Sequence, residues 1–280
     1  MLTHTFCHIH GIGLKIERSL WESGISSWQS ALSSGRFERF ERGLLSGIVE
    51  SVDRLEAGEP DYFAALLPAS ESWRLFSEFR GQTAYLDIET NGQMPPYGYI
   101  TAISLYDGKT TRVYVRGRNL DDFKNDIMRF KVIVTYNGKC FDVPFIRRSL
   151  GIRMPHAHID LRCVLGSLGF KGGLKGCERR LGLDRGELNG VDGYTAVLLW
   201  HDYKKNGNLK ALDTLLAYNA LDTVNLETLM VEAYNLKLAA TPFHALLAPA
   251  AHSAAPKPEF KPDVQTLARL AAGMSGFRGV

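Results

Sequence analysis

Hydrophobic and polar residues follow three different patterns along the chain and divide it into three regions. Residues 1–78 repeat apolar positions at helical spacing, as in SLWESGISSWQSAL. Residues 81–238 alternate between strand-like and helix-like segments, and residues 239–280 begin with an Ala- and Pro-rich stretch before the amphipathic segment DVQTLARLAAGM. These patterns predict a helical region, a larger domain that mixes strands with helices, and a flexible, linker-like tail with a short final helix.

The middle region has the signals of a mixed sheet. TAYLDIE and KVIVTYNG are apolar runs typical of buried strands. YITAISLYDG and TTRVYVRG alternate like half-buried strands, and Asp107-Gly108 between them indicates a hairpin turn. Helices are predicted for NLDDFKNDIMRF, which Asn119 would cap, and for FDVPFIRRSLG, which would close on Gly151. A hairpin followed by strand–helix alternation predicts an α/β fold, in which helices flank a mixed sheet.

Composition is that of an ordinary globular protein, with 45% hydrophobic and 22% charged residues in a chain of 280. No apolar run approaches the roughly 20 residues needed to span a bilayer, and MLTHTFCHIHGIG lacks the features of a secretory signal. The four cysteines show no paired short spacing. We therefore expect reduced thiols in a cytoplasmic protein without a membrane partner.

Charge is distributed unevenly, although the net charge is only +3. Residues 1–80 carry eight Lys and Arg against eleven Asp and Glu, whereas residues 147–185 carry nine basic against three acidic residues. This basic stretch is compatible with two interpretations, a path for a phosphate backbone and a solvated helix face, between which charge alone does not decide.

Acidic residues in three separated segments are the main chemical signal. Asp87 and Glu89 lie two apart in YLDIET, so both point to the same face of a predicted strand, and no Lys or Arg lies nearby in the sequence. Two carboxylates on an apolar strand need a partner, and hard oxygen ligands suit Mg²⁺ or Mn²⁺.

Two more carboxylates complete the pattern. Asp142 follows the strand VIVTYNG at a strand-to-helix turn, where it could equally be a helix cap. Asp222 lies in the helical segment LLAYNALDTVNLETL, four residues after Tyr218, so the two share one helix face; the alternative is a core Tyr beside a surface Asp. Four carboxylates from three elements can hold two cations about 3.5–4 Å apart for an in-line displacement. Tyr218 would then orient the attacking water or help to deprotonate it.

Three segments resemble the motifs of the DEDD (DnaQ-like) exonuclease superfamily. YLDIET at 85–90 is similar to the first motif, YNGKCFDVPF at 136–145 to the second, and YNALD at 218–222 to the third in its tyrosine subtype. The resemblance covers about residues 81–238. It implies a ribonuclease-H-like fold with a five- or six-stranded sheet and release of nucleoside monophosphates from a single-stranded 3′ end. It also implies that Asp87, Glu89, Asp142 and Asp222 bind the metal ions.

The same resemblance suggests which residues meet the nucleic acid. Thr90 and Asn91 would contact the terminal nucleotide, Asn137 would support the site through hydrogen bonds, and Phe141 would pack beneath it. The alternative for Asn137 is a turn residue before Gly138.

The amino-terminal segment HIHGIGLKIERSLWESGISSW resembles a helix-hairpin-helix element. In this interpretation Gly11 and Gly13 form a turn that offers backbone amides to a DNA phosphate, and Lys15 adds positive charge. The alternative is a tight turn between packed helices, which the acidic balance of this region favours.

These observations predict a 3′→5′ exonuclease that acts on nucleic acid, with DNA favoured over RNA because of the amino-terminal segment. Two other functions stay open. One is a non-catalytic nucleic-acid-binding module on the same scaffold, and the other is a structure-specific endonuclease.

Overall fold

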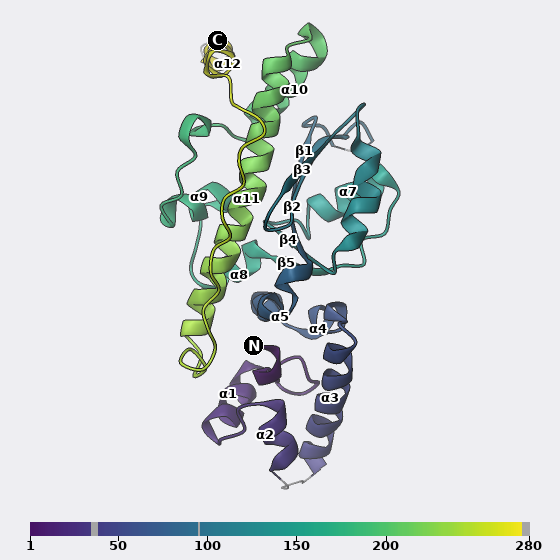
Figure 1. Cartoon of the computed structure of the whole chain (residues 1–280), viewed down its shortest axis with the longest axis vertical. Helices are drawn as coiled ribbons and strands as arrows, with labels where there is room; N and C mark the ends of the chain where they lie inside the picture. Colours follow the sequence, from purple (N-terminus) through teal and green to yellow (C-terminus); the bar gives the residue numbers. More distant parts are fainter. Residues whose placement is uncertain (35–38, 95, 276–280) are drawn as a thin grey trace.

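A computed structural model describes residues 1–34, 39–94 and 96–275 (Figure 1). Residues 35–38, Pro95 and residues 276–280 belong to the predicted helical region, the loop NGQMPPYG and the predicted tail, and they lie outside the described residues. Within the described ranges five strands form one sheet: β1 (Thr83–Thr90), β2 (Ile100–Tyr106), β3 (Thr111–Val115), β4 (Val132–Thr135) and β5 (Ala157–Asp160).

The strand order is β3-β2-β1-β4-β5, with β1 in the centre. β1 is antiparallel to β2 and parallel to β4, β2 is antiparallel to β3, and β4 is parallel to β5. The turn between β2 and β3 is the predicted hairpin, in which the Asp107 carboxylate accepts the Lys109 and Thr110 amides at 2.9 and 2.8 Å. The prediction of a mixed α/β sheet flanked by helices is therefore confirmed.

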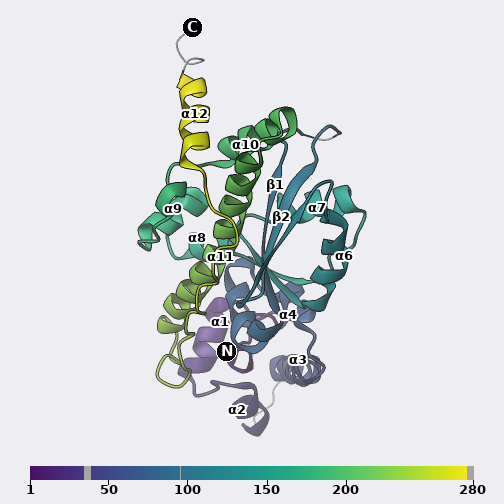
Figure 2. The same cartoon turned by 45° about the horizontal axis from the view of Figure 1, so that its top comes forward.

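The two faces of β1 are covered by different helices. Ala84, Leu86 and Ile88 share an apolar cluster with residues of α6 (Phe123–Asp126) and α7 (Asp142–Leu150). The alternate positions face the long helix α11 (Leu209–Ala239), against which α10 (Gly193–Asn206) also packs. Figure 2 shows α6 and α7 on one side of the sheet and α10 and α11 on the other. Because side chains alternate along a strand, β1 presents Asp87 and Glu89 to α11.

Two smaller helices, α8 (Leu161–Ser167) and α9 (Gly173–Arg180), lie between β5 and α10 in the sequence. The predicted helix NLDDFKNDIMRF is shorter than expected, because α6 is flanked by two 3-10 turns. The Asn119 side chain does not cap it and instead bonds to the backbone of Val113 and Val115. Among the described residues, no helix is both long and apolar enough to cross a bilayer.

The amino-terminal region is helical, as the pattern predicted, and runs directly into β1. It contains α1 (Leu14–Glu22), α2 (Trp28–Ser33), α3 (Arg39–Glu56), α4 (Pro60–Leu66) and α5 (Phe76–Phe79), together with short 3-10 helices at Leu2–His4, Ala69–Leu75 and Arg80–Gln82. Its apolar side chains share one core with β4, β5 and the carboxy-terminal half of α11. Figure 1 places this region beyond the start of β1.

The carboxy-terminal segment differs from the flexible linker that its composition predicted. Its backbone runs along α11 and ends in α12 (Val264–Ser275) (Figure 1). The Asn235 side chain bonds to the backbone of Ala250, and the Asp263 amide donates to Thr214 Oγ1 at 2.8 Å. These hydrogen bonds hold an Ala- and Pro-rich stretch that has no secondary structure of its own.

Candidate metal centre

Asp87 and Glu89 extend from β1 toward Asp222 on α11. One ligand atom from each of the three carboxylates lies within 4.8 Å of the other two. Glu89 and Asp222 are buried, and Asp87 is partly exposed. The structure therefore brings together residues that are separated by more than 130 positions in the sequence.

Asp142 approaches the same place from the start of α7. β1 pairs with β4 as far as Tyr85, and beyond this point the strands part and β1 needs other hydrogen-bond partners on that edge. The Asp142 Oδ1 atom fills this role by accepting the Ile88 amide at 3.2 Å. Asp142 lies outside the group of three carboxylates within 4.8 Å, but its charge acts strongly on Asp87.

Helix α11 supplies two further side chains, of which sequence analysis predicted only one, Tyr218. Tyr218, one turn before Asp222, is 4% exposed and faces the carboxylates. Asn219 was not predicted, and its amide nitrogen donates to Asp87 Oδ2 at 2.7 Å. The three-residue spacing from Asn219 to Asp222 is the signal that places both side chains on one helix face.

Two basic side chains also contact the carboxylates of the centre, and both belong to the basic stretch of residues 147–185. Lys175 Nζ lies 2.6 Å from Asp222 Oδ1, and the Arg185 guanidinium contacts the same oxygen. Arg185 is held in turn by Glu178, at 2.6 and 2.9 Å from its two carboxylate oxygens. Lys175 and Arg185 therefore point inward, toward Asp222, rather than outward as a path for phosphates would require.

Other members of the basic stretch do face solvent. Arg147, Arg148 and Arg153 are exposed and line a shallow groove at the end of α7. Arg180 donates to the Gly169 carbonyl and lies over the Phe170 ring. The two interpretations of the basic stretch thus apply to different residues within it.

Burial and mutual repulsion dominate the electrostatics of the centre. Burial raises the pKa of Asp87 and of Glu89 well above the ordinary values, and the neighbouring carboxylates add to this effect while Lys175 opposes it. Burial also raises the pKa of Asp142, to about 7. Hard oxygen donors with this excess of negative charge fit divalent cations such as Mg²⁺ or Mn²⁺.

The remaining predicted contacts around β1 have defined surroundings. Asn91 is buried, and its side chain bonds to the Tyr99 amide and the Tyr97 carbonyl, so it shapes the loop after β1. Thr90 is partly exposed beside it and accepts the Gly92 amide. Asn91 therefore has structural partners at the place where a contact to a nucleotide was predicted.

Near α7, Asn137 has a left-handed backbone with φ of 65°. Its amide donates to Asp160, and its side-chain oxygen accepts from Arg162 at 2.6 Å. Phe141 is 42% exposed and its ring centroid lies 5.7 Å from that of Phe145. The structure thus gives Asn137 the position of a turn residue and leaves Phe141 partly exposed next to Asp142.

The amino-terminal glycines lie in another part of the molecule. Gly13 precedes α1 as its N-cap, Gly11 has a positive φ of 82°, and Lys15 is exposed. A three-residue 3-10 helix, Leu2–His4, stands before this turn, in the position that the first helix of a helix-hairpin-helix element would take. The structure does not bring Gly11, Gly13 and Lys15 to the carboxylates, because the amino-terminal region lies beyond the opposite end of β1 (Figure 1).

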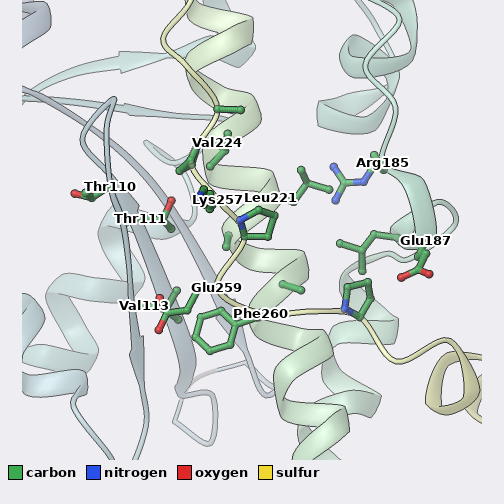
Figure 3. A pocket seen from close by; sticks show the side chains of 17 residues that line it. Thr110, Thr111, Val113, Arg185, Glu187, Leu221, Val224, Lys257, Glu259 and Phe260 are labelled. Atoms are coloured by element: carbon green, nitrogen blue, oxygen red, sulfur yellow. The ribbon is translucent and has the colours of Figure 1, made fainter.

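A cavity of about 510 Å³ lies next to the centre, and Arg185 is one of the residues that line it (Figure 3). Its walls are mostly apolar, with Leu221 and Val224 from α11 and Phe260 from the carboxy-terminal segment. None of the four carboxylates is among the described residues that line it.

Comparison with known proteins identifies the family. The sequence profile of the RNase_H superfamily matches residues 84–234, which is more than half of the chain and includes all four carboxylates. The chain therefore belongs to the RNase_H superfamily.

No curated protein sequence gives a significant match. Among solved structures, the family B DNA polymerase from the hyperthermophilic archaeon Pyrobaculum calidifontis is similar, with 20% sequence identity and a TM-score of 0.42. The match covers 56% of this chain and 24% of the polymerase chain.

Proposed function

We propose that this protein is a 3′→5′ exonuclease that hydrolyses phosphodiester bonds with two divalent cations, Mg²⁺ or Mn²⁺. The observation that carries the proposal is the meeting of Asp87, Glu89 and Asp222 within 4.8 Å, in a place where two basic side chains do not balance them. Membership of a superfamily of nucleases and the order of the three motifs support the same activity.

The four carboxylates would hold the two cations between them. Asp87, Glu89 and Asp222 would hold one, and Asp87 with Asp142 would hold the other. When bound, such a pair would supply activation of a water molecule and stabilisation of charge on the departing 3′ oxygen. Asn219 fixes the Asp87 carboxylate by its hydrogen bond, and Ile88 fixes that of Asp142. These contacts limit the freedom of the ligands before any cation arrives.

Tyr218 would orient the attacking water. Burial raises the pKa of its hydroxyl above the ordinary value, and the charge of Asp222 raises it further. The hydroxyl therefore keeps its proton at neutral pH, which favours orientation of the water through a hydrogen bond over removal of its proton.

Substrate contacts follow from exposure and chemistry. Phe141 offers an exposed ring on which a base of a single-stranded 3′ end can stack, and Thr90 lies at the end of β1 beside Glu89. Gly11, Gly13 and Lys15 would contact DNA at a separate position, through amides at the start of α1. This second contact is the reason to favour DNA over RNA.

The test uses three linear substrates labelled at the 5′ end, which are single-stranded DNA, duplex DNA and RNA. Circular single-stranded DNA is the substrate without ends. Each is incubated with Mn²⁺ or with a chelator. We expect stepwise shortening of linear DNA from its 3′ end with Mn²⁺, and no cleavage by Asp222→Ala. Cleavage of the circle would favour the structure-specific endonuclease. Binding without any cleavage would favour the non-catalytic module.

A further inference from the structure

We propose that Lys175 is a tethered cation that occupies Asp222 in the metal-free protein and is displaced when a divalent ion binds. This inference rests on the proposed function, because it takes Asp222 as a metal ligand. The Lys175 ammonium lies 2.6 Å from Asp222 Oδ1 and is close enough for its charge to act on Asp87 and Glu89 as well. It therefore stands among the same three carboxylates that would surround a metal ion.

The two basic side chains that contact Asp222 differ in how tightly their surroundings hold them. The Arg185 side chain is 6% exposed, and both oxygens of Glu178 accept hydrogen bonds from it. Glu178 is itself fixed by Asn225 of α11, at 2.8 Å. Arg185 is thus a permanent partner that positions the Asp222 carboxylate.

Lys175 has a less confined environment. Its side chain is 26% exposed, and besides Asp222 its ammonium lies over the Tyr218 ring, 4.4 Å from the centroid. A lysine ammonium is a compact charge on a flexible four-carbon stem, so rotation about the stem can carry it to solvent. Lys175 is therefore the cation at Asp222 that can be exchanged.

The entry into α9 directs this lysine inward. Gly172 is the N-cap residue before the helix and has a positive φ of 89°, and a Cβ atom on Gly176 would lie 2.4 Å from the Lys171 carbonyl oxygen. The tight turn therefore requires glycine on both sides of Lys175. This requirement ties the sequence KGGLKG to the position of the ammonium beside α11.

Exchange has a thermodynamic consequence. A divalent ion at Asp222 must remove the contact with Lys175 and is repelled by any ammonium that stays nearby. Lys175 therefore stabilises the metal-free protein and weakens metal binding. A nucleic-acid phosphate would attract the displaced ammonium, so metal and substrate should bind more tightly together than separately.

The test measures Mn²⁺ binding to the full chain stripped of metal, by the electron paramagnetic resonance signal of free Mn²⁺, without nucleic acid. We expect Lys175→Met to bind Mn²⁺ about tenfold more tightly than the wild type and its metal-free form to have a lower Tm. Lys109→Met is the matched control, because Lys109 is exposed on the β2–β3 turn, and it should bind Mn²⁺ like the wild type. Lys175→Gln repeats the test if Lys175→Met does not fold.

Unchanged or weaker Mn²⁺ binding in folded Lys175 variants would overturn the exchange of cations and leave the proposed nuclease intact. A different result would remove both proposals: a wild type that binds no Mn²⁺, or an Asp222→Ala variant that binds it as well as the wild type.

Discussion

Two buried groups of charged side chains, one between the amino-terminal region and α11 and one at the candidate metal centre, differ in their charge balance. In the first, Arg74 lies 2.8 Å from Glu17 and 2.9 Å from Glu71, and Lys237 lies 3.0 Å from Glu71. Two carboxylates thus meet two cations. At the metal centre five carboxylates, with Glu178 included, meet only Lys175 and Arg185 among the described side chains.

The pKa values follow this balance. Burial acts to raise the pKa of Glu71, but the charges of Arg74 and Lys237 outweigh it and leave that pKa below the ordinary value. At the metal centre burial raises the pKa of Asp87, and the nearby carboxylates reinforce it. The comparison teaches that the acids of the first group are matched by positive charge and act as a structural link. The acids of the candidate metal centre are not matched, which is the charge pattern that a cation site requires.

The largest expected effect comes from Asp87→Asn, which removes one unbalanced carboxylate. Hydrolysis should fall by about a thousandfold or more, because Asp87 would contact both cations. The Tm of the metal-free protein should rise, because a buried repulsion is lost. Nuclease assays and thermal unfolding check this, with Asp213→Asn on the exposed side of α11 as the control. Full activity, or a lower metal-free Tm, would contradict the assignment.

Glu17→Gln tests the group in which the charges balance. It should lower the stability of the protein, whereas Asp87→Asn should raise the stability of the metal-free form. Glu17 is 1% exposed and accepts hydrogen bonds from Arg74 and from the amides of Phe6 and Cys7. Its loss should lower the free energy of unfolding by about 3 kcal/mol without changing Mn²⁺ affinity. Urea unfolding measures the effect. The exposed pair Arg54–Glu59 supplies the control, since Glu59→Gln should leave the urea midpoint nearly unchanged.

A third effect concerns pH and Asp142. Burial raises the pKa of this carboxyl to about 7 in the folded protein, above its unfolded value of 3.8. The folded state therefore binds the proton more tightly. The resulting stability is fully present below about pH 4 and is lost as pH rises through 7. In metal-free samples, the Tm of the wild type relative to Asp142→Asn should fall from pH 4 to pH 8. Parallel curves for the two proteins would show that Asp142 keeps its ordinary pKa.

Sequence patterns predicted the parts of the fold and site that depend on local periodicity. The alternation along YLDIET predicted that Asp87 and Glu89 share a face, and the paired strands around Asp107 predicted the hairpin. The mixed sheet followed from the order of these segments.

Features that depend on packing between distant elements were not predictable in this way. The inward direction of Lys175 and Arg185 is set by the contact of α9 and the following loop with α11, whereas their sequence neighbours suggest a solvated basic surface. The bond from Asp142 to Ile88 depends on where β4 separates from β1, which no local pattern records. Asn119 bonds to Val113 and Val115 of β3, which lies at the edge of the sheet, and the sequence around Asn119 does not show this position.

The carboxy-terminal segment determines where the chain can be truncated. Near its beginning, the ring of Phe243 packs against His4 and Trp21 of the amino-terminal region, and near its end Arg269 pairs with Asp202 of α10 at 2.5 Å. Between these points it covers α11, the helix that carries Asp222. Truncation to residues 84–234, which match the superfamily, would uncover that helix along its length, so the folded unit that holds Asp222 extends past the matched residues.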